Sequence, residues 1–147
     1  KLNLFMSNKN LYLKLIGFLT KKGNKSKALK IVNSAFLNVS DKTGLSFSEI
    51  SLKLFDSLNC FVEVKKVKIK RGSHFVPFLV SPKRRSYLIV KWLVQASLED
   101  KSNLSFSEKL SSEIQKTVVG NSSRSLKTKA FNLNQALSNR SNIHYRW

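Results

Sequence analysis

Residues 62–80 read VEVKKVKIKRGSHFVPFLV, two runs rich in Val, Ile and Phe on either side of Gly72. β-branched and aromatic runs separated by glycine are typical of a hairpin, so we expect a two-stranded β-ribbon at about 61–80. The first run also carries several cations: Lys65, Lys66, Lys68, Lys70 and Arg71. An isolated hairpin is marginally stable in water, and like charges destabilise it further. We therefore expect an anionic partner outside the chain to offset this repulsion.

The ribbon sequence also makes predictions about its local geometry. Its valine and isoleucine residues occupy even positions before Lys65 and odd positions after Lys66, which predicts a β-bulge at these two lysines. We place Gly72 in the turn, and Pro77 is tolerable because a two-stranded ribbon has only edges. Lysines on an edge also prevent aggregation. Two or three lysines would serve that purpose, and the ribbon has more.

The rest of the chain has the three-to-four-residue apolar spacing of helices, which predicts a mostly helical chain with one β interruption. Three apolar stripes precede the ribbon and three follow it, at 11–19, 28–39, 47–58, 89–96, 106–118 and 126–137. We expect the first helix to end near Gly23 and the second at Gly44. The fifth is expected to end at Gly120.

One pentapeptide, LSFSE, opens two of these helices, at 45–49 and at 104–108. In each copy the first Ser and the Glu three residues later fit a capping box, the pair Ser46 and Glu49 being the first. We interpret this as one local solution used twice, because five residues are too few to indicate a duplication.

The fourth predicted helix begins with Ser81 as N-cap and Pro82 as its first residue. Its first turn then carries Lys83, Arg84 and Arg85. Cations at a helix N-terminus oppose the helix dipole, and a bound anion would reverse that penalty. We therefore expect an anion close to this turn.

Composition points to the same kind of partner. The chain has 147 residues and 41% hydrophobic content, enough for one domain, 1–147, with a packed core. It has 27 Lys plus Arg against 8 Asp plus Glu, a net charge of +19. A charge of this size favours polyanions, with nucleic acid as the first candidate and an anionic membrane surface as the second. The longest apolar runs are too short for a membrane span.

The motifs of common enzymes are missing from the sequence. There is no P-loop, no G-x-G-x-x-G and no metal-ligand spacing, and the single Cys60 forms no internal disulfide. Apart from the neighbours Glu99 and Asp100, the acids form no pair on a shared face. We predict a protein that is not an enzyme and that needs no cofactor or metal.

Six short motifs then indicate a family. They are GNKSKA at 23–28, FVEVK at 61–65, VP at 76–77, SPKRR at 81–85, KWLVQA at 91–96 and HYRW at 144–147. In this order and spacing, over residues 14–147, the chain resembles the seventh protein of the small ribosomal subunit. The resemblance implies a mainly α, six-helix bundle-like domain whose β-ribbon protrudes between helices 3 and 4.

The same resemblance implies a function. Members of the family bind the 3′ major domain of small-subunit rRNA, help to nucleate assembly of the head and contact neighbouring ribosomal proteins. Their ribbon lies near the exit-site tRNA and the mRNA path. A basic C-terminal segment is expected at about 139–147.

RNA-binding residues follow by position, mainly as cations that neutralise phosphates. The positions that match the family are Lys14, Lys25, Lys27, Lys65, Arg84, Arg85, Lys91, Lys127, Lys129, Arg140 and Arg146. The ribbon and the C-terminus add Lys66, Lys68, Lys70, Arg71, His144, Tyr145 and Trp147. Tyr145 and Trp147 either stack on a base or pack on the domain, and Trp92 is expected in the core.

One departure from the family lies at the ribbon tip, where Lys70 and Arg71 replace a usual Gly-Gly pair. Lys, Asn, Ser, Phe and Leu are heavily used while Gly and Pro are scarce, a bias that suits an AT-rich organellar genome. With the divergence, this favours a mitochondrial ribosome over a plastid or bacterial one. The alternatives are a free nucleic-acid-binding regulator or packaging protein, and a membrane-surface protein.

Overall fold

The computed structural model describes the backbone of residues 2–70, 72–120 and 122–146, and the side chains of these ranges from residue 11 onward. Three helices precede a hairpin: α1 (Leu2–Leu19), α2 (Lys25–Thr43) and α3 (Phe47–Leu58). The hairpin consists of β1 (Val62–Ile69) and β2 (Gly72–Leu79). It is followed by α4 (Pro82–Leu98), α5 (Phe106–Val119), α6 (Arg124–Ser138) and the short 3₁₀ helix η1 (Arg140–Tyr145). The predicted mainly α fold, with its ribbon between helices 3 and 4, is confirmed.

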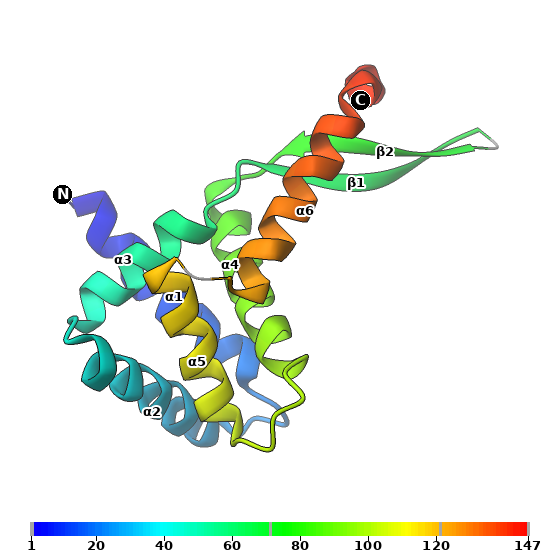
Figure 1. The fold of residues 1–147 in the computed structure, drawn as a ribbon. Helices are drawn as coiled ribbons and strands as arrows, with labels where there is room; N and C mark the ends of the chain where they lie inside the picture. Colours follow the sequence, from blue (N-terminus) through cyan, green and yellow to red (C-terminus); the bar gives the residue numbers. More distant parts are fainter. Residues whose placement is uncertain (1, 71, 121, 147) are drawn as a thin grey trace.

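The helices α1 to α5 form a compact body, and the two strands extend away from it to one side (Figure 1). Helix α6 crosses the base of the strands, so that the C-terminal end lies beside the ribbon (Figure 1). None of the described helices combines the length and the apolar character that a membrane crossing requires.

The main core lies between α1, α2, α3, α4 and α5. Its fully buried side chains include Leu15, Ile16, Val32, Ile50, Leu54, Ile89, Leu93, Leu110 and Ile114. A smaller cluster of Cys60, Val80, Leu88 and Trp92 lies at the base of the ribbon, with Leu133 of α6 packed against it. The expected core position of Trp92 is therefore confirmed, and this cluster joins the ribbon to the body.

Both predicted capping boxes are present. At the start of α3 the backbone N–H of Ser46 donates to Glu49 at 2.8 Å, and the N–H of Glu49 donates back to the Ser46 hydroxyl. The bond from the Ser46 N–H, together with one that the Ser46 hydroxyl donates to the same carboxylate, lowers the pKa of Glu49. Ser105 repeats the arrangement at α5, and Gly44 and Gly120 adopt left-handed conformations at the ends of α2 and α5.

Two details of the helices differ from expectation. Helix α1 ends at Leu19, four residues before Gly23, and Lys22 and Gly23, both with positive φ, form the turn that leads into α2. In the last helix the expected apolar stripe is only partly inward, since Ala130 and Leu137 are exposed. Helix α6 packs against the ribbon base as well as the body. Its buried alanine is therefore Ala136, which lies near the ribbon, and not Ala130.

The ribbon has no bulge, and that prediction was wrong. Its antiparallel register runs without interruption from the Val62–Leu79 pair to the Ile69–Gly72 pair. The change of phase has another cause: the outer half of the ribbon has no core to face, so burial no longer dictates which positions are apolar. Gly72 is the first residue of β2 and not a turn residue, and Lys70 takes up the turn with φ 51°.

Candidate nucleic-acid interface

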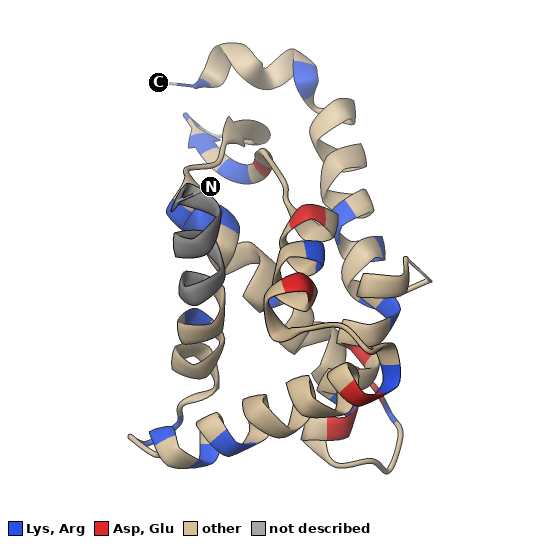
Figure 2. Cartoon of the chain, turned by 90° about the vertical axis from the view of Figure 1, so that its left-hand side faces the viewer, with Lys and Arg blue, Asp and Glu red and all other residues tan. Residues whose placement is uncertain are grey.

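Cations occur on both sides of the view in Figure 2, whereas the acids lie mostly on one side. In Figure 2 blue segments mark the ribbon, α1 and the start of α2 on the left-hand side of the view, and further blue segments mark α6. The red segments lie in the right-hand half, apart from one in the ribbon. A surface with many cations and few acids is suited to a polyanion.

The ribbon lysines are exposed and lie on both faces. Because paired residues share a face, Lys66 and Lys68 lie on the side of Phe75 and Ser73, and they line a shallow hollow with Gly72 and Ser73. Lys65 lies on the other face, with its ammonium 5.5 Å from the ring centre of Phe78. An extended polyanion can therefore meet cations on either side of the ribbon.

Arg84 has a partner within the chain, Glu63, that the sequence did not predict. Its Nη2 and Nε donate to the two carboxylate oxygens of Glu63 at 2.7 and 3.1 Å. This bidentate pair lowers the pKa of Glu63 and raises that of Arg84. The anion expected near the first turn of α4 is thus supplied in part by Glu63 of β1. The sequence feature that could have indicated this ion pair is that Glu63 is the single acid among the ribbon cations.

Arg85 and Lys91 lie close to this pair. The Nε of Arg85 donates to the carbonyl of Val80 at 3.2 Å, and its guanidinium lies 4.4 Å from the ring centre of Phe61. Lys91 is exposed, and its charge contributes to the lowered pKa of Glu63. Arg85 therefore has a packing role, whereas Lys91 is available to solvent.

Lys14 connects α1 to the start of α4. Its ammonium donates to the carbonyl of Lys83 at 2.6 Å. Partial burial and the charge of Lys83 lower the pKa of Lys14. Two cations held close together in this way are favourable to an anion, which would offset their repulsion.

Four further predicted cations lie on α2 and α6. Lys25 and Lys27 are exposed in the first turn of α2, where the cap Asn24 makes no side-chain capping bond. On α6, Lys127 is exposed, whereas the ammonium of Lys129 donates to the carbonyl of Ser57 at 2.7 Å. Lys129 thereby satisfies a carbonyl at the C-terminal end of α3.

The C-terminal residues contact the ribbon. The Nε of Arg146 donates to the carbonyl of Pro77 at 2.6 Å, and the ring of Tyr145 stacks on His74 with 5.0 Å between ring centres. His144 donates through Nδ1 to the carbonyl of Ser141 at 2.7 Å, and Arg140 is exposed. The predicted residues Arg71 and Trp147 lie outside the described residues.

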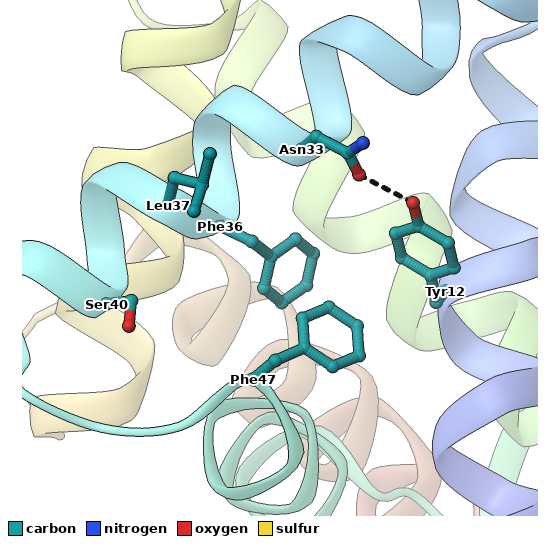
Figure 3. Close-up of a pocket in the computed structure, with 6 residues that line it drawn as sticks. All are labelled: Tyr12, Asn33, Phe36, Leu37, Ser40 and Phe47. Atoms are coloured by element: carbon teal, nitrogen blue, oxygen red, sulfur yellow. Dashed lines mark hydrogen bonds between the residues drawn. The ribbon is translucent and has the colours of Figure 1, made fainter.

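The described residues contain no group of three His, Cys, Asp or Glu side chains placed to hold a metal ion. A groove of about 430 Å³ between α1, α2 and α3 is mostly apolar (Figure 3). Tyr12 donates to Asn33 at 2.6 Å on one side of it, and Phe36 and Phe47 lie on the other (Figure 3). This groove has no paired acid and base for catalysis.

Fold and charge together define a class of protein: a small, basic, mostly helical domain that presents a charged hairpin and lacks an enzyme's motifs. Comparison with known proteins names the family. The model of ribosomal protein S7p/S5e matches residues 3–140. Small ribosomal subunit protein uS7 of Caldicellulosiruptor saccharolyticus is 34% identical over 95% of this chain and 88% of its own length.

A second relative agrees with the first. Small ribosomal subunit protein uS7 of Clostridioides difficile is 34% identical over 91% of this chain and 85% of its own length. The chain therefore belongs to the ribosomal protein S7p/S5e family. It is a structural protein of the small ribosomal subunit and not an enzyme, as the sequence predicted.

Proposed function

We propose that the chain binds the 3′ major domain of small-subunit rRNA and helps to nucleate assembly of the head. The observation that carries this proposal is the exposure of Lys66, Lys68 and Lys70 along a ribbon that extends away from the body. In a free protein these charges would repel one another, and RNA phosphates would offset that repulsion.

The proposed interface consists of two groups of residues. The first has charged ends exposed to solvent: Lys25, Lys27, Lys65, Lys66, Lys68, Lys70, Lys91, Lys127 and Arg140. The second already donates within the chain and keeps further N–H groups for a phosphate: Lys14, Arg84, Arg85, Lys129 and Arg146. We expect the first group to contribute more to affinity, because its donors need not be shared.

The ribbon tip is proposed to lie near the exit-site tRNA and the mRNA path. Support comes from the length of the ribbon, eight residues in each strand, and from its lysines. We further propose a mitochondrial ribosome as the location, because the Lys- and Asn-rich, Gly-poor composition suits an organellar genome. Fractionation of the source cells with antibody detection tests this location, and recovery with cytoplasmic ribosomes would contradict it.

RNA binding is tested with a triple variant, Lys66→Gln, Lys68→Gln and Lys70→Gln. Its matched control removes equal charge from exposed lysines elsewhere, through Lys42→Gln, Lys53→Gln and Lys101→Gln. Fluorescence anisotropy with head-domain RNA measures affinity across salt concentrations. Each lost phosphate contact should reduce the slope of log affinity against log salt by roughly 0.7–0.9.

We expect the ribbon variant to lose several such units of slope and the control to lose fewer. Equal losses in both variants would mean that only net charge matters. Failure of the unmodified chain to bind at modest salt would refute the proposal itself.

A further inference from the structure

We propose that Arg84 and Arg146, two of the cations expected to bind RNA, act as positioning residues that fix the direction of the ribbon relative to the helical body. The brace itself is intramolecular. Its consequence for RNA contact rests on the proposed function above.

The two free edges of the ribbon carry backbone groups that point outward. The N–H of Val80 donates to the carbonyl of Phe61 at 2.9 Å, so even residues of β2 bond to odd residues of β1 in this register. The backbone groups of alternate residues point outward in an antiparallel pair. The carbonyls of Val62 on β1, and of Phe75 and Pro77 on β2, therefore lie on the two free edges.

Each of these outward carbonyls receives a bond from the C-terminal part of the chain. Asn132 of α6 donates to Val62 at 2.9 Å on the β1 edge. On the β2 edge, Asn142 donates to Phe75 at 3.1 Å and Arg146 donates to Pro77 at 2.6 Å. Residues 132–146 thus cross the base of the ribbon and bind both of its edges, as the path of α6 shows (Figure 1).

The face that this segment crosses is apolar. Val62 and Pro77 of the ribbon line a shared groove with Leu133, Leu137 and Ile143. Contact on this face alone would resist movement in one direction only. The bonds at the two edges resist sliding, and a contact on the opposite face adds resistance to movement away from α6.

Arg84 supplies that contact. Glu63 neighbours Val62 along β1, so its side chain points to the other face of the ribbon. There it accepts both bonds from Arg84, whose side chain also lies over Tyr87 with 4.7 Å between the guanidinium carbon and the ring centre. Arg84 belongs to α4, a helix with many buried residues, so this contact ties the ribbon to the core.

The brace extends only part of the way along the ribbon. Its outermost contact in the described part of the chain is the stack of Tyr145 on His74, which pairs with Val67. The lysines at 68 and 70 lie beyond it. A small tilt at the base would therefore become a larger displacement at the charged tip.

The direct test measures the distance between tip and body by pulsed electron paramagnetic resonance, in the full chain without RNA. Spin labels go on Ser73→Cys at the tip and Lys30→Cys on α2, both exposed, while Cys60 is buried and stays unchanged. We expect Arg84→Gln, Glu63→Gln and Arg146→Gln each to broaden the distance distribution at least twofold. Lys101→Gln, the control, should leave it unchanged.

A charge swap keeps the test decisive if a single variant folds poorly. Combining Glu63→Arg with Arg84→Glu restores an ion pair with its partners exchanged, and we expect the narrow distribution to return. Unchanged distributions in folded Arg84→Gln and Arg146→Gln, checked by circular dichroism, would overturn the proposal. So would a swap variant that is folded and as broad as Arg84→Gln.

RNA binding separates this proposal from the preceding one. Glu63→Gln adds one unit of net positive charge, so a purely electrostatic interface predicts tighter binding. If Glu63 acts through ribbon direction, affinity for head-domain RNA falls in spite of the added charge. Failure of the unmodified chain to bind RNA would refute the proposed function and would leave the measured distances as the test of the brace.

Discussion

Glu63 shows how a single acid can change the role of a nearby cation. A cation-rich sequence invites the interpretation that every Lys and Arg faces a polyanion. The carboxylate of Glu63 instead holds Arg84 within the chain, and its own side chain is only 16% exposed. The cations of this surface therefore differ in how readily they can bind an external anion. Those that already donate to an acceptor within the chain are less available than those that do not.

The first prediction at this scale concerns pH. Hydrogen bonds from Arg84 are the main cause of the lowered pKa of Glu63, with Lys65 and Lys91 adding smaller effects. Because the folded-state pKa lies below the ordinary value of 4.5, the stabilisation is complete above pH 4.5 and is lost as pH falls through the lower folded value.

Denaturant unfolding of the natural chain and of Glu63→Gln at several pH values measures this effect. We expect the natural chain to be more stable by roughly 1 kcal/mol or less at pH 7, since Arg84 is partly exposed. The difference should vanish under strongly acidic conditions. A difference that stays constant with pH would show that the carboxylate charge is not responsible.

The second prediction concerns the core. Leu93 is fully buried in α4, whereas Leu37 on α2 is 62% exposed. Leu93→Ala leaves a cavity and should lower the free energy of unfolding by about 2–5 kcal/mol. Leu37→Ala is the matched control and should change it by about 0.5 kcal/mol or less. Similar losses in both variants, measured by denaturant unfolding, would contradict the placement of the core.

At the scale of elements, helix starts are determined by short local signals. Ser46 and Ser105 each accept a bond from the N–H three residues later, in two copies of the same pentapeptide. We predict that Ser46→Ala and Ser105→Ala each destabilise the fold by about 1 kcal/mol. Their effects should add, because the two caps serve different helices.

Thermal and denaturant unfolding check this prediction, with Ser122→Ala at an exposed position as the control. A loss confined to one of the two caps would mean that the pentapeptides are not equivalent in energy. No loss in either would mean that the hydroxyls are replaced by water.

The elements also show which features were predictable from sequence. The six α-helices and the ribbon in the described part of the chain were expected, because their apolar periodicity and caps are local properties of the chain. The predicted β-bulge in the ribbon was wrong. The alternation of apolar residues indicates the face on which a strand is buried only where that strand packs on a core. Similarly, the stripe of α6 did not identify its buried side, because this helix divides its contacts between the body and the ribbon.

At the scale of the whole molecule, the contacts that position the ribbon were not predictable. Arg84 and Glu63 are 21 residues apart, and Arg146 and Pro77 are 69 apart. Such pairs depend on the tertiary arrangement of α4, α6 and η1, and residue spacing contains no signal for them. The candidate RNA-binding residues came from resemblance and charge, so the sequence identified the cations without their internal partners.

The net positive charge of the whole molecule favours association with a polyanion. A net charge of +19 on one small domain is tolerable when a polyanion lies against it. The ribbon lysines are an exposed part of that charge, and a buried cluster at the base joins the ribbon to the helical body.

A density map of the small ribosomal subunit that contains this chain tests the central claim most directly. We expect rRNA phosphate groups within hydrogen-bonding distance of the exposed ammonium groups of Lys66, Lys68 and Lys70, with the pair of Arg84 and Glu63 intact at the base. A map in which these three lysines face solvent or only protein would contradict the claim.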